Sequence, residues 1–354
     1  MKNIAEIDTN FKVEATIDKS GLRFYECTEA PLRTYGVFKE GGKFRRMSES
    51  VAKTVSDGVL ALHANAAGGR VRFVTDSSSV AISARMAGIG KMPHFPLTGS
   101  AGFDIYADDV FVKCFEPPFG IENGYESKIV FADKKMRDIT INFPLYSDVV
   151  DLYVGVDEDC TITEAPAYIN SRPAVYYGSS ITQGGCASRP GSSYQSVVSR
   201  RFNLDYINLG FSGNAKGEDE MIEYIAGLEM SLFVQDYDHN APTPEHLEAT
   251  HEKLFMAVRS ANPDMPIILM SRPKNILTPE EEKRRAIVEA TYKNALASGD
   301  ANVYFLDGAA LTAFCGNDGT VDNCHPTDYG FASMAKAVGS VIESNKSILE
   351  YITK

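Results

Sequence analysis

Asp322 and His325 stand three residues apart, a spacing at which a carboxylate can reach an imidazole within one loop. A carboxylate on one ring nitrogen of a histidine fixes its tautomer and stabilises the imidazolium that forms during proton transfer. Histidine has an unperturbed pKa of about 6.5, so it can act as a base at neutral pH. Such a base activates a serine hydroxyl, and Ser180 is the candidate nucleophile, with Ser179 as the nearest rival. These residue types predict acyl transfer.

The second half of the chain carries the pattern of elements that would bring these residues together. Apolar runs alternate with helical patterns in five β-then-α units, which predicts an α/β fold with a doubly wound, five-stranded parallel sheet. The expected strands cover 174–177, 206–209, 232–234, 267–270 and 303–306, and the expected helices cover 193–201, 218–229, 244–261, 279–298 and 331–342. Carboxyl ends of parallel strands meet at one edge, so the loops after the first, second, third and fifth strands should converge.

The first half of the chain has a different period. Short alternating runs separated by turn residues predict an antiparallel β-sandwich or jelly roll, and the segment 49–64 predicts a short helix. The alternating runs cover 71–74, 80–84, 110–112, 139–143 and 152–154. The boundary falls in a proline-containing segment near 163–173, so we predict a β-sandwich accessory domain over 1–165 and a catalytic domain over 166–354.

Composition excludes several classes of protein. The formal net charge of −12, with no basic stripe, argues against a nucleic-acid partner and against docking on an anionic membrane. No apolar run approaches the roughly 20 residues of a membrane-spanning helix, and the N-terminus has no signal-peptide pattern, which predicts a cytoplasmic protein. The six cysteines form no CxxC pair and are interpreted as reduced thiols. Asp236 and Asp238 could mimic a metal pair, but no second carboxylate cluster supports it, so we predict no metal and no cofactor.

Four sequence blocks, in order, resemble those of the SGNH/GDSL hydrolases, whose fold is flavodoxin-like. The blocks are Gly178-Ser179-Ser180-Ile181-Thr182, Asn208-Leu209-Gly210-Phe211-Ser212-Gly213-Asn214, Asp236-Tyr237-Asp238-His239-Asn240 and Asp322-Asn323-Cys324-His325-Pro326. Ser179 replaces the usual aspartate of the first block, and the third block lacks its usual glycine. In the first half, Gly102-Phe103-Asp104-Ile105-Tyr106 resembles the Gly-x-Asp-Leu-Tyr signature of a β-rich domain that precedes one branch of these enzymes.

The resemblance implies a role for each matched residue. Ser180 would be the nucleophile and His325 its base, oriented by Asp322. The backbone amides of Ser180 and Gly213 and the side chain of Asn240 would form the oxyanion hole.

The predicted function is that of a serine esterase that removes a short acyl group, most simply acetyl, from a carbohydrate. Gln183, Tyr237 and His239 are the candidate substrate contacts, because they lie in the same loops as the reactive groups. The alternatives are a lipase, thioesterase or lysophospholipase of the same fold, and a non-catalytic carbohydrate-binding protein. The expected partner is a small-molecule or oligosaccharide ester. The N-terminal domain would shape one wall of the cleft or mediate self-association into a homo-oligomer.

Overall fold

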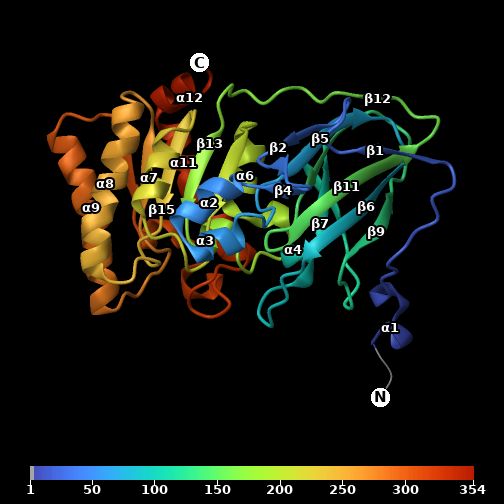
Figure 1. Ribbon diagram of the computed structural model, residues 1–354, viewed down its shortest axis with the longest axis horizontal. Coiled ribbons are helices and arrows are strands. Elements are labelled where there is room, and N and C mark those ends of the chain that lie inside the picture. Colours follow the sequence, from blue (N-terminus) through green and yellow to red (C-terminus); the bar gives the residue numbers. More distant parts are fainter. Residues whose placement is uncertain (1–3) are drawn as a thin grey trace.

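Two kinds of β-sheet divide the chain, antiparallel before residue 164 and parallel after residue 173. The computed structural model describes residues 4–354. Figure 1 shows the two parts side by side, with the parallel sheet and its helices on the left and the antiparallel strands on the right. The predicted fold class, a doubly wound parallel sheet with an N-terminal antiparallel β-sandwich, is confirmed. The narrower assignment as a jelly roll stays a prediction.

The alternating runs of the first half form two antiparallel sheets that enclose one hydrophobic core. One sheet has the strand order β1-β11-β6-β9, and the other has the order β12-β5-β10-β7-β8, with β2 paired to β5. Inward side chains of both sheets, such as Phe73, Ile82 and Leu152, share that core. The strands are β1 (Leu22–Glu26), β2 (Arg33–Tyr35), β5 (Arg70–Thr75), β6 (Ser79–Gly88), β7 (Phe103–Ala107), β8 (Val110–Phe115), β9 (Gly124–Val130), β10 (Arg137–Asn142), β11 (Asp148–Asp157) and β12 (Ile162–Thr163), with a separate hairpin of β3 (Phe38–Glu40) and β4 (Lys43–Arg45).

The helix expected over 49–64 is two short helices, α2 (Glu49–Val55) and α3 (Asp57–Leu62). Ser56 separates them, because it has an extended backbone and its side chain accepts a hydrogen bond from the backbone N–H of Val59. Ala52 and Val59 are fully buried, in a core that they share with one face of the parallel sheet. This segment of the N-terminal half therefore packs on the second half. Two further short helices, α1 (Ile4–Ile7) and α4 (Leu97–Ser100), complete the first half with one 3-10 turn.

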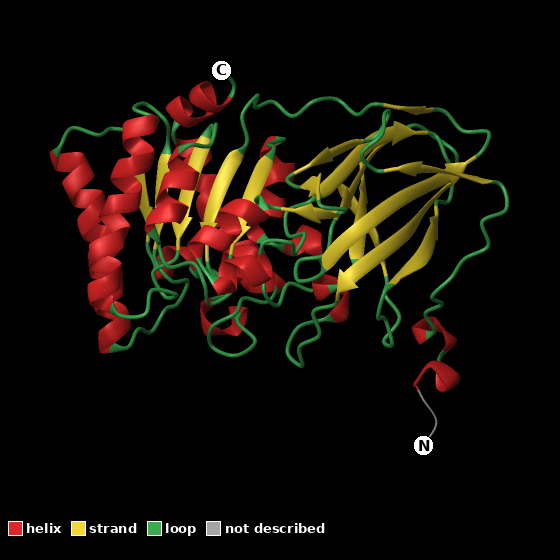
Figure 2. Cartoon of the chain, in the orientation of Figure 1, coloured by secondary structure: helices red, strands yellow, loops and turns green. Residues whose placement is uncertain are grey.

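The second half is a parallel sheet with the strand order β14-β13-β15-β16-β17. Figure 2 shows helices on both of its faces, and a separate hydrophobic core lies against each face. The strands are β13 (Ala174–Gly178), β14 (Tyr206–Gly210), β15 (Leu232–Asp236), β16 (Ile267–Met270) and β17 (Val303–Leu306), and the helices are α5 (Ser180–Gln183), α6 (Tyr194–Phe202), α7 (Asp219–Ala226), α8 (Pro244–Ala261), α9 (Pro279–Ala297), α10 (Gly308–Leu311), α11 (Asp328–Ser344) and α12 (Lys346–Ile352). The order is flavodoxin-like, so ligands are expected where it reverses, at the carboxyl ends of β13 and β15.

Two buried arginines from the first half close the free edge of this sheet. β14 is an edge strand, and an exposed edge presents unpaired backbone groups. Arg70 donates to the carbonyl oxygen of Tyr206 at 3.2 Å, and Arg46 donates to those of Asn208 and Gly210 at 3.1 and 2.5 Å. These three carbonyls alternate along the strand. The two guanidinium groups therefore replace the neighbouring strand that the edge lacks.

Arg46 holds its position through contacts on both sides of the boundary. Besides β14, it donates to the carbonyl oxygens of Leu62 and Asn65, each at 2.8 Å, and its guanidinium lies 4.8 Å from the ring centroid of Phe211. Burial lowers the pKa of Arg46 to about 10, so the side chain remains charged at neutral pH.

A second link between the halves comes from the segment that resembles Gly-x-Asp-Leu-Tyr. Asp104 on β7 is fully buried, and its two carboxylate oxygens accept hydrogen bonds from the Asn142 side chain and the backbone N–H of Gly191, each at 2.7 Å. Gly191 belongs to the 3-10 turn before α6, in the second half. Asp104 thus joins the sandwich to a loop of the parallel-sheet half.

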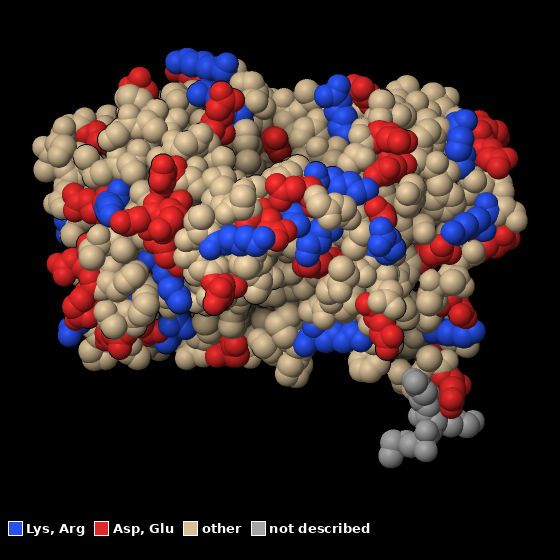
Figure 3. Space-filling view, viewed as in Figure 1, with Lys and Arg blue, Asp and Glu red and all other residues tan. Residues whose placement is uncertain are grey.

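The surface is mixed in charge. On the face shown in Figure 3, acidic and basic side chains are interspersed, and no continuous basic stripe crosses it. Within residues 4–354, no helix is long and apolar enough to cross a membrane.

Arg46→Met should destabilise the protein by at least about 3 kcal/mol, because it leaves several buried carbonyl groups without a donor, at roughly 1–3 kcal/mol each. Arg85→Met is the matched control, since Arg85 is exposed and its ion pair with Asp151 should contribute less than about 1 kcal/mol. Urea denaturation followed by circular dichroism measures both. Equal losses for the two variants would contradict the role given to Arg46.

Candidate active site

Two adjacent serines follow β13, and they make different contacts. Ser179 is the N-cap of α5, and its hydroxyl accepts a hydrogen bond from the backbone N–H of Ile181 at 3.1 Å. Ser180 is the first residue of that helix, and its Oγ lies 2.9 Å from Nε2 of His325. Of the two, Ser180 is therefore the serine with a base beside it. The capping of the helix falls to Ser179.

The loop before α11 presents His325 and Asp322 as one local unit. The Oδ2 of Asp322 lies 2.7 Å from Nδ1 of His325, and its Oδ1 accepts from the backbone N–H groups of Cys324 and His325 at 3.0 and 2.7 Å. Asn323 adopts φ of 64°, a left-handed conformation that asparagine tolerates well. The side chain of Asp322 thus folds back over its own turn and meets the imidazole.

The protonation pattern of this unit suits a base. Burial alone would raise the pKa of Asp322, but hydrogen bonds from the backbone and ring of His325 outweigh burial and lower it. An ionised Asp322 accepts a hydrogen bond from the N–H at Nδ1, so Nε2 of His325 is the acceptor for the hydroxyl of Ser180. A continuous line of hydrogen bonds therefore runs from Ser180 through His325 to Asp322.

Three hydrogen-bond donors at the strand ends are not engaged by other groups. The backbone N–H groups of Ser180 and Gly213 have no partner among residues 4–354. The side chain of Asn240 makes no hydrogen bond to those residues either, and its Oδ1 is buried. Gly213 has φ of 68° in a turn closed by the N–H of Asn214 on the carbonyl of Phe211 at 2.8 Å, which is a glycine conformation. Free donors are what an oxyanion hole requires. The assignment of these three residues to that role stays a prediction.

Two of the expected substrate contacts are wrong, because the side chains are buried. Tyr237 is fully buried and its hydroxyl lies 2.9 Å from that of Thr250, so the ring belongs to the core. Gln183 is also fully buried, and it donates to Oδ1 of Asn65 at 3.0 Å and accepts from the N–H of Ser212 at 3.0 Å. Gln183 therefore connects the helix that begins at Ser180 to the Gly213 turn and to the first half of the chain.

The third expected contact, His239, lies in a small acidic network after β15. Its Nδ1 is 2.9 Å from Oδ1 of Asp238, and its Nε2 is buried without a partner. Asp236 is fully buried and accepts from the Thr182 hydroxyl at 2.9 Å. Burial, and then the charge of Asp238, raise the pKa of Asp236 well above its usual range. A substrate contact by His239 stays a prediction.

Two sets of side chains in this region have the composition of metal ligands. Asp236, Asp238 and His239 offer atoms within 4.8 Å of one another, as do His94, Cys186 and His325. In the first set, both oxygens of Asp238 and one of Asp236 already accept hydrogen bonds from protein groups. In the second set, His325 is the histidine that lies 2.9 Å from Oγ of Ser180. We interpret both sets as parts of the hydrogen-bonded site.

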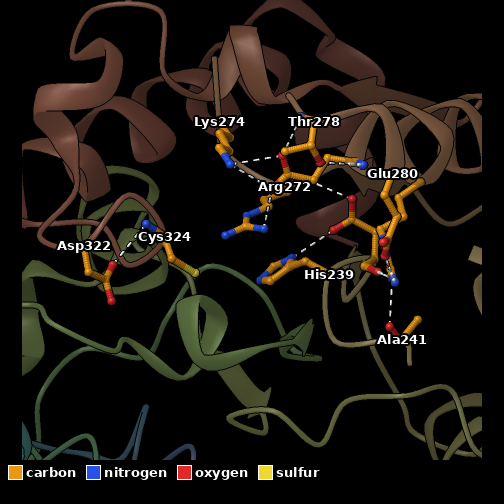
Figure 4. Close-up of polar contacts among 11 residues, drawn as sticks. His239, Ala241, Arg272, Lys274, Thr278, Glu280, Asp322 and Cys324 are labelled. Atoms are coloured by element: carbon orange, nitrogen blue, oxygen red, sulfur yellow. Dashed lines mark hydrogen bonds and ion pairs between the residues drawn. The ribbon is translucent and has the colours of Figure 1, made fainter. Parts of the chain in front are cut away.

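Two residues beside the site were missed from the sequence. Arg272 follows β16, and Figure 4 shows its guanidinium between Cys324 and His239. The rule that loops gather at carboxyl ends of strands could have found it, had the fourth strand been included. His94 comes from the first half, and its ring centroid lies 5.7 Å from that of His325. No local signal marks His94, because its position depends on how the two halves pack.

Two family matches fall on the same two parts of the chain as its two kinds of sheet. Residues 171–343 match the GDSL-like lipase/acylhydrolase family, and residues 22–162 match the GxDLY N-terminal region of SGNH-type esterases. No curated protein matches the sequence significantly.

Solved structures show the same two-part fold. A protein described as a GDSL-like lipase from Bacteroides ovatus is 27% identical, with a TM-score of 0.79 over 93% of this chain and 98% of its own. The salicylyl-acyltransferase SsfX3 of a tetracycline biosynthetic pathway is 18% identical, with a TM-score of 0.76 over 92% and 98%. An acetyl xylan esterase from the rumen bacterium Butyrivibrio proteoclasticus is 12% identical, with a TM-score of 0.61 over 93% and 100%.

The fold and the family matches together define an ester hydrolase. The chain belongs to the SGNH/GDSL hydrolases, in the branch that carries a GxDLY N-terminal region.

Asp236→Asn should make stability less dependent on pH. The raised pKa of Asp236 means that the folded protein keeps a proton that the unfolded chain loses above about pH 4. Stability therefore falls as pH rises from about 4 toward the raised pKa, and asparagine removes that loss. Urea denaturation should show the variant gaining on the wild type from pH 5 to pH 8. The exposed Asp264→Asn is the control, and the same gain in it would refute this explanation.

Proposed function

We propose that this ester hydrolase is a cofactor-independent serine esterase in which Ser180 attacks the ester carbonyl. The hydrogen-bonded line from Ser180 through His325 to Asp322 is the observation that carries the proposal. His325 accepts the hydroxyl proton as the new carbon–oxygen bond forms, and then gives it to the leaving alcohol. Water, deprotonated by the same histidine, hydrolyses the acyl-enzyme and releases the acid. Asp322 stabilises the imidazolium in both halves of the reaction.

The oxyanion of each tetrahedral intermediate would be held by the amides of Ser180 and Gly213 and by Asn240. One such donor typically contributes about 3 kcal/mol to the transition state. The donors come from the loops after three different strands. Side-chain hydrogen bonds hold the backbone around Ser180 and Gly213 in place. Ser179 caps the helix that begins with Ser180, and Gln183 holds the turn of Gly213 through the N–H of Ser212.

The substrate that we propose is a short-chain acyl ester, most simply an acetyl ester, on a carbohydrate. Support comes from proteins that share the fold, which include an acetyl xylan esterase and a family two carbohydrate esterase from Clostridium thermocellum in complex with cellohexaose. These two comparisons cover 93% and 90% of this chain, so both of its halves have a counterpart in these proteins.

We assign residues 1–165 to an accessory domain and 166–354 to the catalytic domain. The accessory part would brace the catalytic loops and form one wall of the cleft. His94 lies against His325, the hydroxyl of Tyr146 donates to the carbonyl of Ser180 at 3.2 Å, and Asn65 accepts from Gln183. These contacts favour the wall over a role in self-association alone.

Ser180→Ala should lower kcat for p-nitrophenyl acetate by about 10⁴-fold or more, since no other hydroxyl among residues 4–354 is hydrogen-bonded to His325. Ser179→Ala should keep the nucleophile and lose only a helix cap, which costs about 1 kcal/mol of stability. Steady-state kinetics and labelling by a fluorophosphonate distinguish the two serines. If the first variant kept its activity, or if the label fell on Ser179, the assignment of the nucleophile would be wrong.

Acyl-chain preference separates the proposed esterase from the lipase alternative. On p-nitrophenyl acetate, butyrate, octanoate and palmitate, we expect kcat/KM to be highest for the shortest chains. A maximum at octanoate or longer would favour a lipase or lysophospholipase instead. Release of acetate from acetylated oligosaccharides then tests the carbohydrate half of the proposal.

A further inference from the structure

We propose that Arg272 binds a carboxylate on the alcohol half of the substrate, so that the preferred ester is that of an acidic sugar of the uronic-acid type. This inference rests on the proposed function, because it names the substrate of the same site.

Arg272 lies between two of the loops that form the site. It follows the carboxyl end of β16, and its backbone N–H donates to Oδ2 of Asp238, in the loop of Asn240, at 3.1 Å. On its other side is the thiol of Cys324, the residue before His325. In Figure 4 the guanidinium points into the space between Cys324 and His239. A group bound to Arg272 would therefore be close to both loops.

The arginine is held from behind by a rigid anchor. Its Nη1 donates to Oε1 of Glu281 at 2.6 Å, and Glu281 is itself fixed in the capping box that begins α9 at Thr278. Lys274 donates to both oxygens of Glu281, at 2.9 and 3.0 Å. Two cations thus share one carboxylate, and one positive charge is left without a counterion in this group of three residues.

The other carboxylates nearby are already engaged. Asp238 accepts from His239 and from the backbone of Arg272, and Asp322 accepts from the ring and backbone of His325 and from the backbone of Cys324. Neither pairs with the guanidinium. Within residues 4–354, Nε of Arg272 is buried without a partner, and the guanidinium otherwise meets Glu281 and the thiol of Cys324, which is only a weak acceptor. The side chain is 21% exposed, and its charge therefore faces the space between Cys324 and His239 without a carboxylate of its own there.

A carboxylate is the group that best pairs with the uncompensated charge of Arg272. It supplies the missing negative charge and accepts charge-assisted hydrogen bonds, which are about twice as strong as neutral ones. A neutral sugar hydroxyl could accept one hydrogen bond but would leave the charge unpaired. The carboxylate belongs to the alcohol half of the ester, because His325 must reach the leaving oxygen and Arg272 lies beside the same loop.

The test compares two substrates that differ in one charge, an acetylated methyl glucuronide and the same acetylated sugar with its carboxylate methylated. We expect wild-type kcat/KM to favour the charged ester by at least about tenfold, mainly through KM, as one charge-assisted hydrogen bond would give. Arg272→Gln should abolish that ratio, and Arg272→Lys should keep part of it. Lys253→Gln removes a charge from an exposed ion pair on α8 and should leave the ratio unchanged.

Three outcomes would overturn the proposal: no wild-type preference, a preference that survives Arg272→Gln, or equal loss of both substrates in that variant. If the variant does not fold, inhibition of wild-type p-nitrophenyl acetate turnover by free methyl glucuronide, compared with methyl glucoside, decides the question. Equal inhibition by the two would reject the carboxylate site. If instead the wild type hydrolyses no ester at all, the proposed function fails, and that result is distinct from a lost preference.

Discussion

The free edge of the parallel sheet is the constraint on which the rest of the structure depends. β14 leads directly into the turn of Gly213, so any fraying of that strand would move the backbone N–H that we propose as an oxyanion donor. A helix or another strand usually protects such an edge. Here two charged side chains from another part of the chain do so, by binding the three carbonyl groups that face outward. The parallel sheet of the second half therefore needs the first half to complete its edge.

The chemistry at the strand ends depends much less on distant parts of the chain. Asp322 reaches His325 because their turn is closed by the carboxylate itself, and Ser179 caps the helix that Ser180 begins. Such short-range hydrogen bonds preorganise a site within each loop, and the sheet then needs only to bring the loops together. This division between local geometry and sheet order explains how widely different relatives can share the fold.

The same division explains what could be predicted from the sequence. The parallel sheet and its strand positions follow from period, and the contact between Asp322 and His325 follows from spacing, both of which are local. The contact between Ser180 and His325 was expected from the convergence of loops at the strand ends and from the family resemblance. Tyr237 and Gln183 were assigned wrongly, since proximity in a loop does not say which way a side chain points, and both point inward. Arg46 and His94 act across long separations in sequence, so no pattern within a single segment identifies them. Arg272 follows the fourth strand, whose loop was not considered. The single helix expected over 49–64 failed for a local reason, the capping serine in its middle.

The fourth strand shows how reaction and selectivity can be separated on such a sheet. The loops after β13, β14 and β15 and the loop before α11 hold the groups that would act on the ester itself, and these same groups would serve any acyl ester. The loop after β16 holds none of them, yet it carries a charge that its neighbours do not neutralise. A change there can alter which alcohol is accepted without disturbing the hydrogen bonds among Ser180, His325 and Asp322. Because Glu281 anchors Arg272 from α9, outside those four loops, selectivity can vary while the reactive geometry stays fixed.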